Sequence, residues 1–167
     1  MASILKTDKI EGVTASGTVQ MPEGTIIQYK FQTSSTEVDN SSSSFVSTSV
    51  AIAFTPKFAN SIIQIHWDGH LRKHASGSGG FGYQLYQDST ALHDVGMDAG
   101  NKPWSEFKDE TRITTRCVRT ISHVAGDTNS RTYTCKFKGY NSELVEVNTS
   151  SDSGSNEEIM IVMEIAQ

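Results

Sequence analysis

Apolar residues alternate with polar or small residues along much of the chain, and this period of two is typical of β-strands. The alternation is clearest over residues 50–54, 63–71, 81–85, 133–137 and 159–165. Successive side chains of a strand point to opposite faces, so the apolar set of each segment predicts the face that packs in the core. Ile159, Ile161, Met163 and Ile165 form one such face, and Met160 and Val162 form the other. The last strand is therefore expected to be covered on both sides.

Turn-forming residues separate these segments, as in VDNSSSS (38–44), AGDTNS (125–130) and SSDSGSN (150–156). They divide the chain into about nine strands at roughly 10–15-residue spacing, with no long helix. This pattern predicts an all-β fold, an antiparallel β-sandwich of jelly-roll type. An immunoglobulin sandwich is the competing architecture, but Trp67 and Trp104 both precede Cys117, which is the wrong order for it.

The chain divides into an N-terminal arm (residues 1–22) and a head domain (residues 23–167), whose first core strand is expected over 25–32. The arm has few large apolar residues and cannot form a core alone. It is either a flexible tail or an extended segment that becomes ordered against neighbouring chains. On the second interpretation, attachment and oligomerisation depend on its apolar side chains, which are Ile4, Leu5, Ile10 and Val13. The start of the arm, MASILKTDKIEG, lacks the apolar core of a signal peptide, so synthesis in the cytosol is expected.

Composition excludes several classes of protein. There are 14 Lys and Arg residues against 19 Asp and Glu, and the net charge of −5 argues against binding to nucleic acid. No stretch approaches the 20 or so apolar residues that span a bilayer, so membrane insertion is not expected. Two cysteines are too few for a disulfide framework or a zinc site.

Cys117 and Cys135 are predicted to lie on neighbouring strands of one hairpin, joined by the turn near Gly126. A simple hairpin centred near residue 128 places Cys117 opposite residue 139, too far from Cys135 for a disulfide. We therefore expect two reduced, buried thiols.

Three patterns resemble sites but have simpler interpretations. Residues 77–82 (GSGGFG) match a dinucleotide-binding fingerprint, yet a strand follows them rather than a helix, so a connecting loop is expected. His66, Asp68 and His70 share one strand face, but about 7 Å separates successive members, which favours a polar surface over a metal site. Asp94, Asp98, Glu106, Asp109 and Glu110 are interpreted as a charged loop. No catalytic constellation, metal site or cofactor is predicted.

The segment 93–109 contains Gly96, Gly100 and Pro103 and has the character of a long loop. Long loops on a rigid sandwich commonly carry recognition. The candidate receptor-binding residues are His93, Asp98, Asn101, Trp104 and Glu106. The alternative is that Trp104 folds back and covers the core.

The chain resembles the small β-rich tail-fibre and structural proteins of tailed phages that infect marine bacteria, including cyanobacteria. The segments that carry the resemblance are, in order, ILKTDKIEG, PEGTIIQ, SSSSFVSTSVAIAFTPKFANSIIQI, GYQLYQDST, RTYTCKFKG and IVMEIA. The resemblance implies a virion protein, a homotrimeric fibre or adhesin whose N-terminal segment joins other virion proteins and whose head contacts host polysaccharide or protein. The chain is short and has almost no shaft, so attachment to tail, baseplate or capsid stays open. A capsid decoration or head-fibre protein is the alternative, and a jelly-roll carbohydrate-active enzyme is a more distant one.

Overall fold

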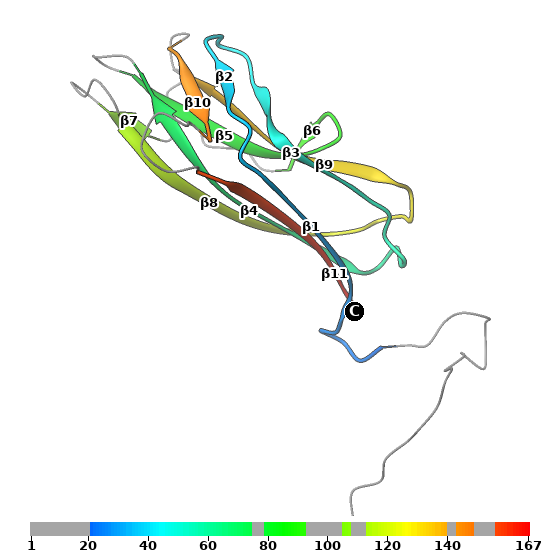
Figure 1. The fold of residues 1–167 in the computed structure, drawn as a ribbon. Coiled ribbons are helices and arrows are strands. Elements are labelled where there is room, and N and C mark those ends of the chain that lie inside the picture. Colours follow the sequence, from blue (N-terminus) through cyan, green and yellow to red (C-terminus); the bar gives the residue numbers. More distant parts are fainter. Residues whose placement is uncertain (1–20, 75–78, 93–104, 108–112, 140–142, 149–155) are drawn as a thin grey trace, which may run out of the picture.

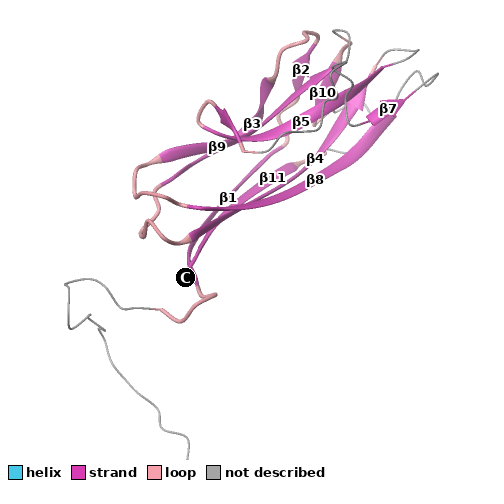
Figure 2. Ribbon diagram, turned by 180° about the vertical axis from the view of Figure 1, so that it is seen from behind, coloured by secondary structure: helices cyan, strands magenta, loops and turns pink. Residues whose placement is uncertain are grey.

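The computed structural model describes residues 21–74, 79–92, 105–107, 113–139, 143–148 and 156–167. Within these ranges every regular element is a β-strand (Figure 2). The strands are β1 (Ile26–Ser34), β2 (Val38–Asn40), β3 (Val46–Phe54), β4 (Ile62–Lys73), β5 (Gly79–Gln87), β6 (Thr90–Ala91), β7 (Ser105–Phe107), β8 (Ile113–Val124), β9 (Arg131–Gly139), β10 (Val145–Val147) and β11 (Glu158–Ile165). The all-β prediction is confirmed.

The strands form two antiparallel sheets that pack face to face (Figure 1). The larger sheet has the order β1-β11-β4-β10-β2, with β8 paired to the other edge of β4. The smaller sheet has the order β3-β9-β5-β6, with β7 also paired to β5. These two layers are the predicted β-sandwich.

Eight of the described strands pair in a nested order, from the two ends of the domain inward. β1 pairs with β11, β3 with β9, β4 with β8, and β5 with β7. Successive members of this series alternate between the two sheets, so the chain wraps around the core as a folded ribbon. Nested antiparallel pairs of this kind define a jelly roll, in agreement with the predicted type.

The core lies between the sheets and contains the residues that the alternation selected. Their side chains are fully or almost fully buried: Val50, Ile52, Phe54, Ile63, Ile65, Trp67, Leu71, Phe81, Tyr83, Leu85, Tyr133, Cys135 and Phe137. The ring centroids of Trp67 and Tyr83 lie 5.2 Å apart, which joins the two sheets near the middle of the sandwich. The predicted inward faces are thus confirmed for four of the five alternating segments, 50–54, 63–71, 81–85 and 133–137.

Strand β11 departs from the prediction that both of its faces are covered. Its inner face contains Met160 and Val162 with Glu158 and Glu164, and all four residues are buried. The opposite face, which begins with Ile159, is only half-buried. The apolar face expected to lie in the core therefore points outward, and two carboxylates point inward.

The two buried carboxylates accept hydrogen bonds from groups distant in sequence. Glu158 accepts from the backbone N–H of Ser49 at 2.9 Å, from the indole Nε1 of Trp67 at 2.8 Å and from Nδ2 of Asn148 at 3.2 Å. These bonds connect the edge of β3 to the larger sheet. They satisfy a charge that would otherwise be costly to bury.

Glu164 makes an equivalent connection at the other end of β11. Its oxygens accept from the backbone N–H groups of Lys57 at 2.9 Å and Phe58 at 3.0 Å, and from the Ser61 hydroxyl at 2.7 Å. Gln28 Nε2 of β1 also donates, at 2.6 Å. One carboxylate thus holds the 55–61 connection against two strands of the larger sheet.

The predicted hairpin between the two cysteine-containing strands is wrong. β8 pairs with β4 in the larger sheet, whereas β9 pairs with β3 and β5 in the smaller one. The 125–130 turn therefore crosses between the sheets, and the buried Arg131 closes it by donating to the carbonyls of Ala125 and Asp127. Cys117 faces Gly69 across the β4–β8 ladder rather than residue 139. Both thiols are buried and free, as expected.

Candidate functional site

Most of the predicted site residues lie outside the described part of the chain. This holds for the arm residues Ile4, Leu5, Ile10 and Val13, and for the loop residues His93, Asp98, Asn101 and Trp104. Glu106 belongs to β7, where its backbone lies opposite Gly80 of β5. Within the described ranges, the candidate sites are surfaces of the two sheets.

His66, Asp68 and His70 lie on the outer face of the larger sheet, as a polar surface. Asp68 accepts a hydrogen bond from Nε of Arg116 at 2.8 Å and a second from the same guanidinium. These hydrogen bonds, together with the positive charge of Arg116, lower the pKa of Asp68. Nδ1 of His66 contacts the Thr120 hydroxyl at 2.9 Å. Cross-strand partners thus satisfy Asp68 and His66, whereas Nδ1 of His70 is buried without a hydrogen-bond partner among the described residues.

A charged cluster lies further along the larger sheet, where β2, β10 and β4 meet. The carboxylates of Glu37, Asp39 and Glu146 approach within 4.8 Å of one another. Burial, followed by the charges of Glu146 and Glu37, raises the pKa of Asp39. Glu146 lies 2.5 Å from Nε2 of His74 and 3.9 Å from Nε of Arg72. The guanidinium of Arg72 therefore opposes part of the acidic charge of this cluster.

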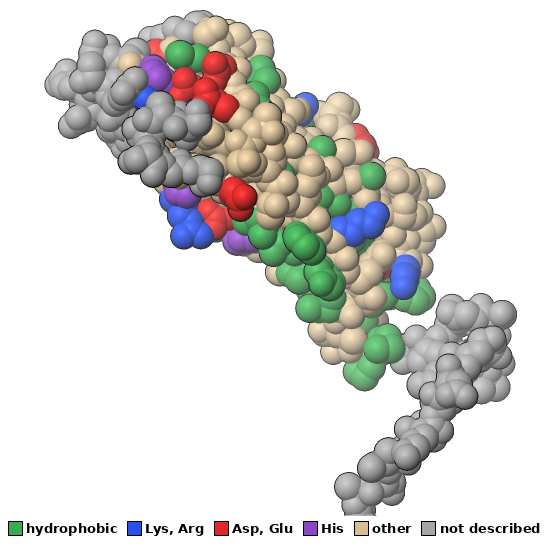
Figure 3. Space-filling view, viewed as in Figure 1, with side chains coloured by type: hydrophobic (Ala, Val, Ile, Leu, Met, Phe, Trp, Pro, Cys, Tyr) green, Lys and Arg blue, Asp and Glu red, His purple; other side chains and the backbone are tan. Residues whose placement is uncertain are grey.

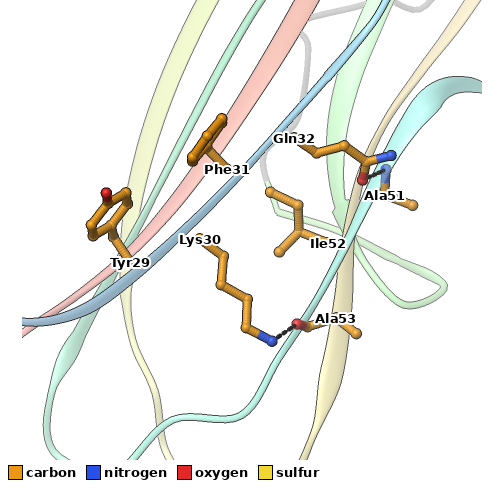
Figure 4. A pocket seen from close by; sticks show the side chains of 7 residues that line it. All are labelled: Tyr29, Lys30, Phe31, Gln32, Ala51, Ile52 and Ala53. Atoms are coloured by element: carbon orange, nitrogen blue, oxygen red, sulfur yellow. Dashed lines mark hydrogen bonds between the residues drawn. The ribbon is translucent and has the colours of Figure 1, made fainter.

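Strands β1 and β3 lie at the same open side of the sandwich and are connected by side chains. Lys30 and Gln32 point from β1 toward the edge of β3 (Figure 4), and Gln28 reaches the residue that follows β3. Their contacts with β3 and the residue after it are Gln28 Nε2 to Thr55 O at 2.8 Å, Lys30 Nζ to Ala53 O at 2.8 Å, and Ala51 N to Gln32 Oε1 at 3.1 Å. A shallow groove of about 760 Å³ follows this seam. Polar side chains thus satisfy backbone groups that an edge strand leaves open.

The alternate residues of β1 point to the outer face of the larger sheet. Tyr29 is 63% exposed and Phe31 is 62% exposed. Their rings stack with centroids 6.4 Å apart and planes inclined by 15°. The strand predicted over 25–32 is therefore present as β1, but it is an edge strand whose large aromatic residues face away from the core.

The two aromatic residues belong to a larger hydrophobic surface. Three neighbouring rows cross β1, β11, β4 and β8, starting at Ile26, Tyr29 and Phe31. Within the four described strands, these rows contain no Lys, Arg, Asp or Glu. We call their hydrophobic members the apolar patch: Ile26, Tyr29, Phe31, Ile62, Val124, Ile161, Met163 and Ile165. Figure 3 shows hydrophobic side chains gathered along this face, toward the end of the molecule that carries the C-terminus.

The apolar patch is suited to binding by burial rather than to chemistry. It offers flat hydrophobic surface and no paired acid and base. Hydrophobic surface of this extent marks interaction sites on soluble domains. The sequence TIIQYKFQ does not predict this exposed surface, because the same alternation is expected of a strand whose aromatic residues are buried in the core.

No family model matches the chain, and no curated protein matches it. Among solved structures, it is similar to a protein in the structure of infectious bursal disease virus, Gx strain, at 11% identity and a TM-score of 0.25. The similarity covers 99% of this chain and 47% of the viral chain, so this chain spans about half the length of that protein. A likeness at this level carries no argument about function. Among the described residues, no helix has the length and hydrophobicity to cross a bilayer.

Proposed function

We propose that the chain is a structural protein of a phage virion, a homotrimeric tail fibre or adhesin. Residues 1–22 attach it to other virion proteins, and the β-sandwich forms a head that contacts the host surface. The sequence resemblance supports the virion role. The observation that carries self-association is the apolar patch, because a domain with a complete core gains nothing from exposing it unless another molecule covers it.

The positions of the strand ends support the division of labour between arm and head. Residues 21–25 and the C-terminus lie at one end of the sandwich (Figure 1). There, Gly24, with φ of 84°, donates from its N–H to the Ala166 carbonyl, and Ala166 donates to Thr25. The ends of β4 and β5 that flank residues 75–78, together with β7, lie at the opposite end. An attachment arm and host-contacting loops would thus leave the domain in opposite directions.

The proposal includes no enzymatic role and no cofactor. Three of the described carboxylates have structural partners: Asp68 pairs with Arg116, and Glu158 and Glu164 hold the sheets together. Binding by burial and attachment through an arm require only surfaces of the kind described above.

Locating the protein on intact particles tests the proposal. Antibody labelling in electron microscopy is expected to place it on the tail, and particles produced with a chain lacking residues 1–22 are expected to lose the label. Label on the capsid shell would favour the decoration or head-fibre alternative. Absence of the protein from purified particles, or normal incorporation of the truncated chain, would overturn the virion role or the role of the arm, respectively.

A further inference from the structure

We infer that the outer face of the larger sheet is the contact surface between copies of this chain, with Tyr29 and Phe31 as its principal anchors. This deepens the self-association of the proposed function by naming the surface and its occupant. The inference stands on the size of the apolar patch, on its lack of Lys, Arg, Asp and Glu, and on the composition of residues 1–20, which are the alternative occupant considered below.

The exposed area of the patch is sufficient for a specific interface. An aromatic side chain covers roughly 150–250 Å². The exposed 63% of Tyr29 and 62% of Phe31 therefore amount to about 250 Å². Ile26, which is 54% exposed, Val124, which is 58% exposed, and the half-buried residues of β11 bring the total to roughly 500 Å². Two such patches in contact remove about 1,000 Å² from water, which is the lower limit for a specific protein interface.

The charge pattern favours a second copy over residues 1–20 as the occupant. As an extended strand, the segment 4–13 would carry Lys6 and Asp8 on the face of Ile4 and Ile10. Its other face would combine Leu5 and Val13 with Lys9 and Glu11. Either face would bring charged groups onto hydrophobic side chains in rows that hold no Lys, Arg, Asp or Glu to pair with them, which costs free energy. The patch of another copy has no such mismatch.

The border of the patch also has the character of an interface. The next row beyond Phe31 contains Asp68, which pairs with the exposed guanidinium of Arg116. Interfaces between proteins commonly combine a hydrophobic centre, rich in aromatic residues, with a charged, solvated rim. Tyr29 and Phe31 are large side chains of the type that contributes most to binding when a partner covers them.

Mass in solution tests the inference. We expect the full-length protein at tens of micromolar to have a mass of at least two times 18.2 kDa, measured by analytical ultracentrifugation. The double variant Tyr29→Thr and Phe31→Thr keeps strand-forming residues at exposed positions, and it is expected to raise the dissociation constant at least about 100-fold. Circular dichroism would verify that the variant is folded.

The matched control removes the same two residue types from the outer face of the smaller sheet. Phe45 and Tyr86 are half-buried there, with ring centroids 6.3 Å apart and the amines of Lys138 and Lys136 over their rings. The variant Phe45→Thr and Tyr86→Thr is expected to keep the oligomeric mass. Equal dissociation of the two variants would overturn the inference, because the effect would not be specific to one face.

Two further outcomes separate this inference from the proposed function. A wild-type protein that stays at the monomer mass at tens of micromolar overturns both the inference and self-association, whereas particle labelling still decides the virion role. An oligomer that persists in Tyr29→Thr and Phe31→Thr but dissociates when residues 1–20 are deleted overturns the inference alone. It would assign self-association to the arm.

Discussion

Replacing Glu164 by Gln should destabilise the sandwich strongly, although the two side chains have nearly the same shape. The carboxylate is buried and accepts hydrogen bonds from Lys57 N, Phe58 N, the Ser61 hydroxyl and Gln28 Nε2. An amide in its place turns one accepting oxygen into a donor. Whichever way the amide is oriented, an –NH₂ group then faces other donors.

The cost follows from these hydrogen bonds. A buried donor left without an acceptor costs about 1–3 kcal/mol, and the remaining hydrogen bonds weaken because the charge is lost. We therefore expect the free energy of unfolding to fall by about 2–5 kcal/mol. At about 2–4 °C per kcal/mol for a domain of this size, Tm should fall by about 4–20 °C.

Urea denaturation and thermal melts followed by circular dichroism measure the loss. Glu157→Gln is the control, because Glu157 is exposed and adjacent to the same strand, and its effect should stay within about 0.5 kcal/mol. Equal stability of the two variants would refute the reasoning, since it would mean that the carboxylate of Glu164 does not hold the 55–61 connection in solution.

The pH dependence gives a second check on the same residue. Burial alone raises the pKa of Glu164, but the hydrogen bonds from Ser61, from the Lys57 and Phe58 amides and from Gln28 outweigh it, so the pKa lies below the ordinary value of 4.5. A lowered folded-state pKa stabilises the fold above the unfolded-state pKa, and this contribution is lost as pH falls through the folded-state value. The stability gap between wild type and Glu164→Gln should thus be constant between about pH 5 and 7 and narrow below about pH 4.5.

Three other predictions concern the core. Gly69→Ala places a Cβ 2.5 Å from Cζ2 of Trp67, so it should cost about 1–3 kcal/mol in urea denaturation, and an unchanged midpoint would contradict the packing. Burial raises the pKa of Cys117 to about 12 and that of Cys135 well above its ordinary value. Iodoacetamide near pH 8 should therefore label both thiols only after unfolding, whereas rapid labelling of the native protein in mass spectrometry would show that they are accessible. Asn40→Ala should cost about 2–3 kcal/mol, because the buried Asn40 amide joins the 41–44 turn to β9, and a loss below about 0.5 kcal/mol would argue against that connection.

The strands and their inward faces could be predicted because alternation is a local property. Val50, Ile52 and Tyr133 are in the core because their own segments place apolar side chains on one face. The pairing partner of each strand is not local. The 125–130 turn has the composition of a hairpin, yet it crosses to the other sheet around the guanidinium of Arg131, whose role depends on three-dimensional position.

The polar interior could not be predicted for the same reason. Alternation predicts that a glutamate between apolar residues of a strand faces solvent. Glu158 and Glu164 become favourable inside through donors of which most lie about 90–140 residues away in the chain. Tyr29 and Phe31 show the opposite error: the sequence pattern predicts that they are buried, and the structure exposes them. Whether an aromatic face of a strand is covered depends on which sheet lies against it, and sequence periodicity contains no information on that.

The position of β11 has a consequence for how the chain folds during synthesis. Among the described strands, β1 forms a backbone ladder with β11 alone, and β11 lies between β1 and β4 although it is made after both. Until the ribosome has released β11, β1 has no partner in its sheet, and the core beneath β4 lacks Met160 and Val162. Pairing over such sequence distances is slow, because loop closure precedes any stabilising contact. The nascent domain therefore stays open, with exposed hydrophobic strands available to chaperones, until nearly all of it has emerged.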